Sequence, residues 1–167
     1  MGTALAIGQS AFDLWIFVLA LLTTIGFQIT SNFANDYGDG VKGTDNEDRI
    51  GPMRALQSGM LSKSTLKKGI VASVLLSFLL ALLLLFVAFG LENLQLFLIF
   101  SILGILSLWA AIKYTMGTNP YGYQGLGDIA VFLFFGLLGV LGSFFLYTKT
   151  WNWIAVLPAI TIGSLCV

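Results

Sequence analysis

The residue types best suited to chemistry lie in one polar stretch that directly follows a long apolar run. This stretch extends from Asn32 to Arg54 and reads NFANDYGDGVKGTDNEDRIGPMR. Four of its side chains are spaced by three and four positions, so a helix would place them on one face: Asn32, Asn35, Asp36 and Asp39. Three glycines in the same stretch weaken a helix and predict a tight backbone turn: Gly38, Gly40 and Gly43.

These side chains fall into two chemical groups. Carboxylate and amide oxygens are hard ligands that suit magnesium, and the metal candidates are Asp36, Asp39 and Asp45, with Asn35 and Asn32 as neutral oxygen ligands. Guanidinium and ammonium groups suit phosphate oxygens, and the candidate diphosphate contacts are Lys42, Arg49 and Arg54. Both groups together, at a membrane surface, predict a site for a magnesium diphosphate on a lipid. The alternative interpretation is an ordinary hydrophilic loop between two membrane spans.

A second polar stretch, KYTMGTNPYGYQGLGD, extends from Lys113 to Asp128. Tyrosine can face a carbocation with its ring or hydrogen-bond through its hydroxyl. Tyr114 is therefore a catalytic candidate beside Asp36 and Asp39, and Lys113 and Tyr123 are candidate substrate contacts. Asp128 suits a metal ligand or a base, and it equally suits a helix N-cap. For Tyr121 we expect a place in the aromatic belt at the membrane interface.

The composition predicts an integral membrane protein, with 57% hydrophobic residues, 10% charged residues and a mean hydropathy of +0.93. Ordinary globular domains carry about 25% charged residues. A crossing needs roughly 20 apolar residues, and four segments are long enough: 11–29, 69–90, 94–112 and 129–146. Residues 1–10 and 153–167 read as parts of two further spans. We therefore expect an all-α, polytopic transmembrane bundle in which residues 1–167 form part of a single, larger domain.

Basic residues predict the orientation of this bundle. Seven of the eight lie in the polar loops 30–68 and 113–128, and only Lys149 lies on the opposite side. By the positive-inside rule, both loops are expected on the cytoplasmic side of the cell membrane. The net charge of zero gives no reason to expect a nucleic-acid partner. A transporter would carry ionisable groups at mid-membrane, yet between residues 69 and 112 Glu92 alone is ionisable, and it lies in a turn.

Three segments carry a resemblance to a known family: NDYGDGVKGTD, GPMRALQSG and YTMGTNPYGYQGLGD. They resemble the UbiA superfamily of intramembrane prenyltransferases, and most closely its branch that acts on 1,4-dihydroxy-2-naphthoate in menaquinone biosynthesis. The similarity covers most of the chain. The family's first Asp-rich motif falls on Asn35, Asp39 and Asp45.

The resemblance implies a larger helical bundle, magnesium dependence and a polyprenyl diphosphate donor. The polyprenyl group would pass to 1,4-dihydroxy-2-naphthoate with decarboxylation, giving demethylmenaquinone. The alternative is another UbiA-type acceptor, namely a hydroxybenzoate, haem or chlorophyll precursor. The family also uses a second Asp-rich loop, which this sequence does not reach. We therefore expect residues 1–167 alone to bind magnesium diphosphate weakly and not to turn over.

Overall fold

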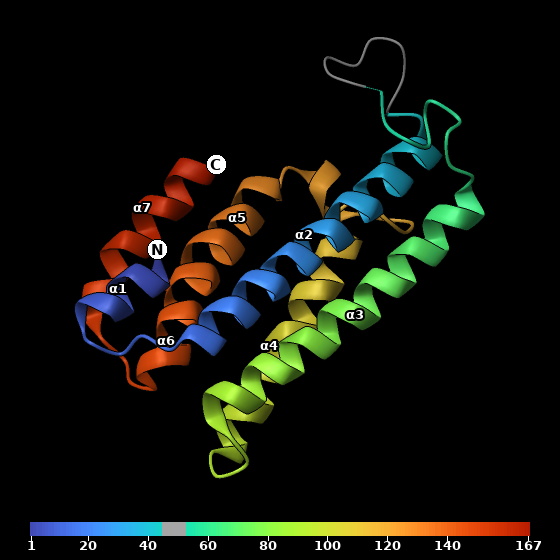
Figure 1. Ribbon diagram of the computed structural model, residues 1–167. Helices are drawn as coiled ribbons and strands as arrows, with labels where there is room; N and C mark the ends of the chain where they lie inside the picture. Colours follow the sequence, from blue (N-terminus) through green and yellow to red (C-terminus); the bar gives the residue numbers. More distant parts are fainter. Residues whose placement is uncertain (45–52) are drawn as a thin grey trace.

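The computed structural model describes residues 1–44 and 53–167, which form helices joined by loops (Figure 1). The elements, in chain order, are α1 (Gly2–Gly8), α2 (Leu14–Lys42), α3 (Lys63–Phe89), α4 (Leu94–Lys113), η1 (Tyr121–Gln124), α5 (Gly127–Val131), η2 (Phe132–Gly142), α6 (Ser143–Thr148), η3 (Trp153–Ala155) and α7 (Val156–Cys166). The expected all-α class is confirmed for the described residues. The π-helical η2 joins α5 and α6 into one continuous apolar rod.

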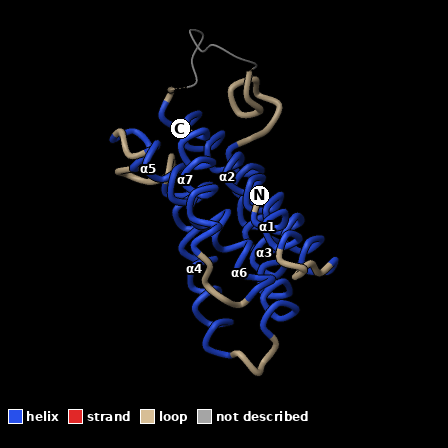
Figure 2. The backbone as a smooth tube through the Cα atoms, turned by 90° about the vertical axis from the view of Figure 1, so that its left-hand side faces the viewer, coloured by secondary structure: helices blue, strands red, loops and turns tan. Residues whose placement is uncertain are grey.

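Four helical segments are long and apolar enough to cross a membrane: Leu14–Lys42, Lys63–Phe89, Leu94–Lys113 and Gly127–Thr148. They alternate in direction, so the described parts of the two polar loops lie at the same end of the bundle (Figures 1 and 2). This confirms the alternating topology expected from the sequence. The apolar segments at the two chain ends form the shorter helices α1 and α7.

Helix α2 is longer than the sequence predicted, and its ends have clear causes. The Asp13 carboxylate begins the helix by accepting hydrogen bonds from the amides of Trp15 and Ile16, at 2.8 and 3.0 Å, as an N-cap residue does. The helix ends at Gly43, which adopts a left-handed conformation with φ of 74°, where glycine carries no Cβ penalty. The turn expected from the three glycines therefore forms at Gly43, and the expectation is wrong at Gly38 and Gly40, because the chain stays helical as far as Lys42.

Small residues bring α2 and α3 together in the middle of the bundle. A Cβ atom on Gly26 would lie only 2.6 Å from the Ser77 hydroxyl. Ser77 is fully buried, and its hydroxyl lies 3.4 Å from that of the equally buried Thr30. Small residues at helix contacts allow this close approach, as membrane helices commonly use. The hydroxyl pair satisfies polar groups that lipid could not.

An apolar core lies at the end of the bundle away from the polar loops. It joins the first turns of α2, the last turns of α3, and α1 with α6, around the buried rings of Phe89 and Phe144. Beside it, η2 packs against α7 through Gly136 and Gly163, because a Cβ on Gly136 would lie 2.6 Å from the Gly163 Cα.

We predict that Gly136→Ala lowers the free energy of unfolding by about 2 kcal/mol, because backbone atoms of α7 cannot retreat from a new methyl group without moving the helix. The matched control is Gly104→Ala in α4, where an added Cβ meets nothing within 4 Å. Alanine is the better helix former there, so stability is expected to hold or rise by up to about 1 kcal/mol. Unfolding of the purified variants in detergent micelles measures both, and equal losses would contradict the proposed packing.

Candidate functional site

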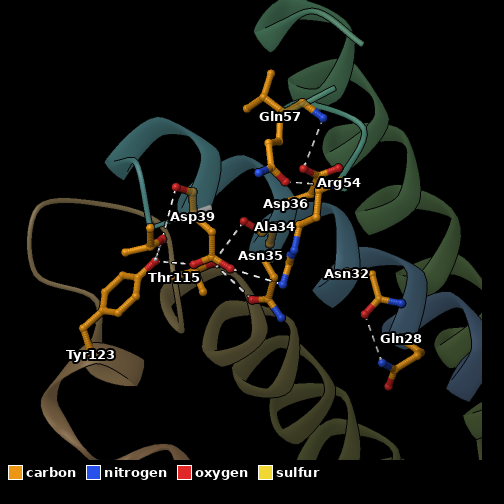
Figure 3. A network of polar contacts seen from close by, with 12 residues as sticks. Gln28, Asn32, Ala34, Asn35, Asp36, Asp39, Arg54, Gln57, Thr115 and Tyr123 are labelled. Atoms are coloured by element: carbon orange, nitrogen blue, oxygen red, sulfur yellow. Dashed lines mark hydrogen bonds and ion pairs between the residues drawn. The ribbon is translucent and has the colours of Figure 1, made fainter. Parts of the chain in front are cut away.

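The last turns of α2 hold three of the predicted site residues together. Asn35, Asp36 and Asp39 are each half-buried, and they stand at the end of the bundle where the two polar loops meet (Figure 3). Their spacing by three and four keeps them on neighbouring positions of one helix surface. This arrangement depends on α2 remaining helical through Gly38, which the turn expected there would have disrupted.

Asp39 is the side chain at which both loops converge. One carboxylate oxygen, Oδ2, lies 3.3 Å from Nη2 of Arg54 in the first loop. The other oxygen, Oδ1, accepts a short hydrogen bond from the hydroxyl of Tyr123 in the second loop. Figure 3 shows these two partners approaching the carboxylate from different sides. Asp39 therefore joins both polar loops to the end of α2.

Tyr123 has further contacts with the end of α2. The Lys42 ammonium lies 4.7 Å from the centre of its ring, a cation–π distance. The hydroxyl of Thr44 lies 3.3 Å from that of Tyr123 and also donates to the Asp39 carbonyl oxygen at 3.1 Å. Two predicted substrate contacts, Lys42 and Tyr123, therefore lie against each other beside the predicted metal ligand Asp39.

Asp36 organises the described part of the first loop. Its Oδ1 atom accepts a hydrogen bond from the Leu56 amide at 3.3 Å. Gly40 lets the Leu56 side chain lie directly on α2, since a Cβ there would come within 2.7 Å of Leu56 Cδ2. The turn that contains Leu56 is thus held against the helix, and it follows directly after Arg54, the residue that reaches Asp39.

Asn35 is held from the second loop by Thr115, a residue that sequence reasoning missed. The Thr115 hydroxyl lies 3.0 Å from the Ala34 carbonyl oxygen and 3.1 Å from Oδ1 of Asn35. Thr115 is only 3% exposed, and a Cβ on Gly38 would lie 2.6 Å from its Cβ and Oγ1 atoms. A glycine inside a polar helical face was the signal for such an approach, but it was interpreted as a helix breaker.

Other predicted residues lie outside this polar network. Asn32 is exposed one turn earlier on α2, where its oxygen accepts a hydrogen bond from Gln28 at 3.2 Å (Figure 3). Lys113 is half-buried in the last turn of α4, a position where a cation complements the helix dipole, and its side chain extends over Gly117. The N-cap interpretation of Asp128 is wrong, because Leu126 occupies that position and Asp128 is exposed in the first turn of α5.

Two tyrosines stabilise the second loop from within. The rings of Tyr114 and Tyr121 pack edge to face at 5.4 Å, and the Tyr121 hydroxyl donates to the Ala110 carbonyl oxygen at 2.8 Å. Burial, followed by the electrostatic influence of Tyr114, raises the pKa of the Tyr121 phenol above its ordinary value, so this donor keeps its proton at neutral pH. Tyr121 thereby ties the loop to α4, and its expected place in an interfacial belt stays a prediction.

The oxygen atoms that the site offers can be compared with the ligands that magnesium prefers. The predicted ligand Asp45 and the predicted phosphate contact Arg49 lie outside the described residues. Within the described ranges, no group of three acidic residues is placed to enclose a metal ion. Magnesium usually binds through one or two carboxylates together with phosphate oxygens and water. Asp36 and Asp39, with the Asn35 amide, supply oxygens of that kind, so the residues present fit the metal as a partner of a bound diphosphate.

Comparison with known proteins places the chain in a class consistent with this site. The chain belongs to the UbiA prenyltransferase family, which it matches over residues 1–167. The family and the four membrane-capable helices together make it a multi-pass membrane protein.

Named relatives lie within the same class. The chain is 51% identical to a 1,4-dihydroxy-2-naphthoate octaprenyltransferase of Haemophilus influenzae, over 92% of this chain and 49% of the relative. It is 48% identical to the enzyme of that name from Escherichia coli, over 99% of this chain and 53% of the relative, and 34% identical to that from Mycobacterium tuberculosis, over 98% and 53%. The chain therefore spans about half the length of the curated relatives that it matches. No solved structure matches it.

We predict that Gly38→Ala weakens the packing of the second polar loop, at Thr115, against helix α2. Its new methyl group would meet the Thr115 carbonyl oxygen at 2.7 Å as well as its side chain, and an overpacked contact of this kind costs about 2 kcal/mol of stability. Gly40→Ala is the matched control, because there the methyl group meets the movable end of the Leu56 side chain. Unfolding in detergent and the rate of proteolytic cleavage in loop 114–126 measure the effect. Faster cleavage in the Gly40 variant than in the Gly38 variant would refute this prediction.

Proposed function

We propose that this chain provides the diphosphate-binding part of a polyprenyltransferase. The polyprenyl group passes from polyprenyl diphosphate to 1,4-dihydroxy-2-naphthoate, whose carboxylate leaves as carbon dioxide, giving the quinol form of demethylmenaquinone. The observation that carries the proposal is the Asp39 carboxylate, held between Arg54 of the first loop and Tyr123 of the second. The names of the relatives support the same reaction and acceptor.

The chemistry begins with the departure of diphosphate. The bond between the prenyl carbon and the diphosphate oxygen breaks, its electron pair stays with the diphosphate, and the aromatic ring supplies the pair for the new carbon–carbon bond. Magnesium, when bound, neutralises the diphosphate and stabilises the negative charge that develops on it. Arg54 and Lys42 are the described cations beside Asp39 and Tyr123, and they are suited to hold phosphate oxygens.

The present contacts indicate how the residues serve a bound diphosphate. Asp39 and Arg54 have side-chain exposures of 15% and 26%, so water can reach both groups. On binding, the Arg54 guanidinium can turn from the carboxylate toward phosphate oxygens, since it has donors in several directions. Tyr123 keeps its hydrogen bond to Asp39 and thereby holds the second loop over the site. Preorganised groups of this kind stabilise charge at little reorganisation cost.

The membrane and the orientation are also part of the proposal. The two polar loops are proposed to face the cytoplasm from the cell membrane, because seven of the eight basic residues lie in them. Lys63, Lys67 and Lys68 near the start of α3 then lie at the headgroup level of an anionic leaflet. Their proposed role is orientation, whereas Lys42 and Arg54 lie in the polar network.

A chimera tests the function and its acceptor. Residues 1–167 replace the matching half of the Escherichia coli relative, in cells that lack that relative, and membranes receive polyprenyl diphosphate, magnesium and one aromatic acceptor. Prenylated product is expected with 1,4-dihydroxy-2-naphthoate and not with 4-hydroxybenzoate, and a chelator should abolish it. Mass spectrometry identifies the product. Prenylated hydroxybenzoate alone would favour the other acceptor class, and an inserted but inactive chimera would contradict the proposal.

In this chimera we predict that Asp39→Asn lowers turnover by a hundredfold or more, and Lys67→Ala by little. Asparagine keeps the shape of Asp39 but removes the charge, and the loss of one electrostatic contact to a transition state costs about 3 kcal/mol. Lys67 is exposed, and its described contact is a Tyr37 ring 5.3 Å away. Initial rates at saturating magnesium, with insertion measured in parallel, compare the two. Near-normal turnover of a well-inserted Asp39 variant would remove Asp39 from the proposed ligands.

A further inference from the structure

The buried hydroxyl of Thr115 has an unusual set of neighbours. It lies within hydrogen-bond distance of two acceptors, the Ala34 carbonyl oxygen at 3.0 Å and Oδ1 of Asn35 at 3.1 Å. A hydroxyl has a single hydrogen and can also accept hydrogen bonds. With two acceptors facing one donor, the hydrogen is shared, and within residues 1–44 and 53–167 no group donates a hydrogen bond to Thr115 Oγ1. At 3% exposure of Thr115, water offers little compensation.

Rotation of the Asn35 amide by half a turn resolves this conflict. The two ends of an amide have nearly the same shape, so the hydrogen-bond partners decide which end faces Thr115. After rotation, the amide nitrogen of Asn35 donates to Thr115 Oγ1, and the Thr115 hydroxyl donates to the Ala34 carbonyl oxygen. Each donor then has its own acceptor, and the carbonyl has a second lone pair beyond its helical hydrogen bond. The amide oxygen now points away from Thr115.

We propose that Thr115 is a positioning residue that turns the oxygen of Asn35 toward a bound magnesium diphosphate. This inference rests on the function proposed above and adds a residue to its site. It also gives a reason for asparagine at position 35, because an aspartate there would have no hydrogen to donate to Thr115. Gly38 contributes to the same arrangement, since only a residue without a Cβ atom allows Thr115 to lie so close to α2.

The test compares two substitutions that separate the hydroxyl from the shape of the side chain. Thr115→Val replaces the hydroxyl with a methyl group, whereas Thr115→Ser keeps the hydroxyl. Binding of magnesium with inorganic diphosphate is measured by calorimetry on the chimera, which contains the full 167-residue chain, in lipid nanodiscs. The valine variant is expected to bind about five- to tenfold more weakly, the effect of one hydrogen bond. The serine variant is expected to bind like the wild type.

A double-mutant cycle with Asn35→Ala decides whether Thr115 acts through Asn35. If it does, Thr115→Val has no further effect on binding once the amide is gone, because contacts that work as a unit are not additive. An equal loss in both backgrounds, or unchanged binding by the valine variant, overturns the positioning role. If the wild-type chimera binds no magnesium diphosphate, the proposed function fails together with the inference. If the wild-type chimera binds magnesium diphosphate but the effects of the two substitutions are additive, the inference about Thr115 fails and the proposed function stands.

Discussion

The hydrogen bond between Tyr123 and the Asp39 carboxylate connects the second polar loop to the end of α2, 84 positions earlier in the chain. Arg54 reaches the other oxygen of the same carboxylate, so one side chain of α2 serves as the meeting point of both polar loops. The position is favourable because it is only partly exposed, and electrostatic contacts strengthen as water is withdrawn. The contacts of Asp36 with Leu56 and of Asn35 with Thr115 hold the same two loops against neighbouring positions of α2.

Close packing of small residues makes the convergence geometrically possible. Gly38 admits Thr115 from the end of α4, and Gly40 admits Leu56 from the first loop. Each glycine costs a helix up to about 1 kcal/mol relative to alanine, so neither residue favours the helix that contains it. The contacts that the two glycines allow with the loops offset this local cost. The same use of small residues joins α2 to α3 through Gly26 and Ser77.

The two ends of the bundle carry different kinds of side chain. Aromatic and aliphatic side chains pack around Phe89 and Phe144 at one end, while the ionisable and amide side chains of α2 gather at the other. Deep in the bundle, the hydroxyls of Thr30 and Ser77 pair with each other, and that of Thr30 also donates to the Gly26 carbonyl oxygen. This separation places a charged site beside the membrane without burying unpaired charges in it, which would be expensive.

Much of this architecture could be predicted from the sequence, because the signals are local or cumulative. Apolar run lengths predicted the four spans, the alternation of those spans predicted a shared end for the two loops, and the polar residues of α2 were recognised by type and spacing. The conformation at Gly38 and the role of Thr115 could not be predicted. Both depend on contacts between residues about eighty positions apart. From the sequence alone, a glycine in a polar stretch predicts the end of a helix. Only the tertiary structure decides whether another segment packs closely enough against that glycine to keep the helix intact.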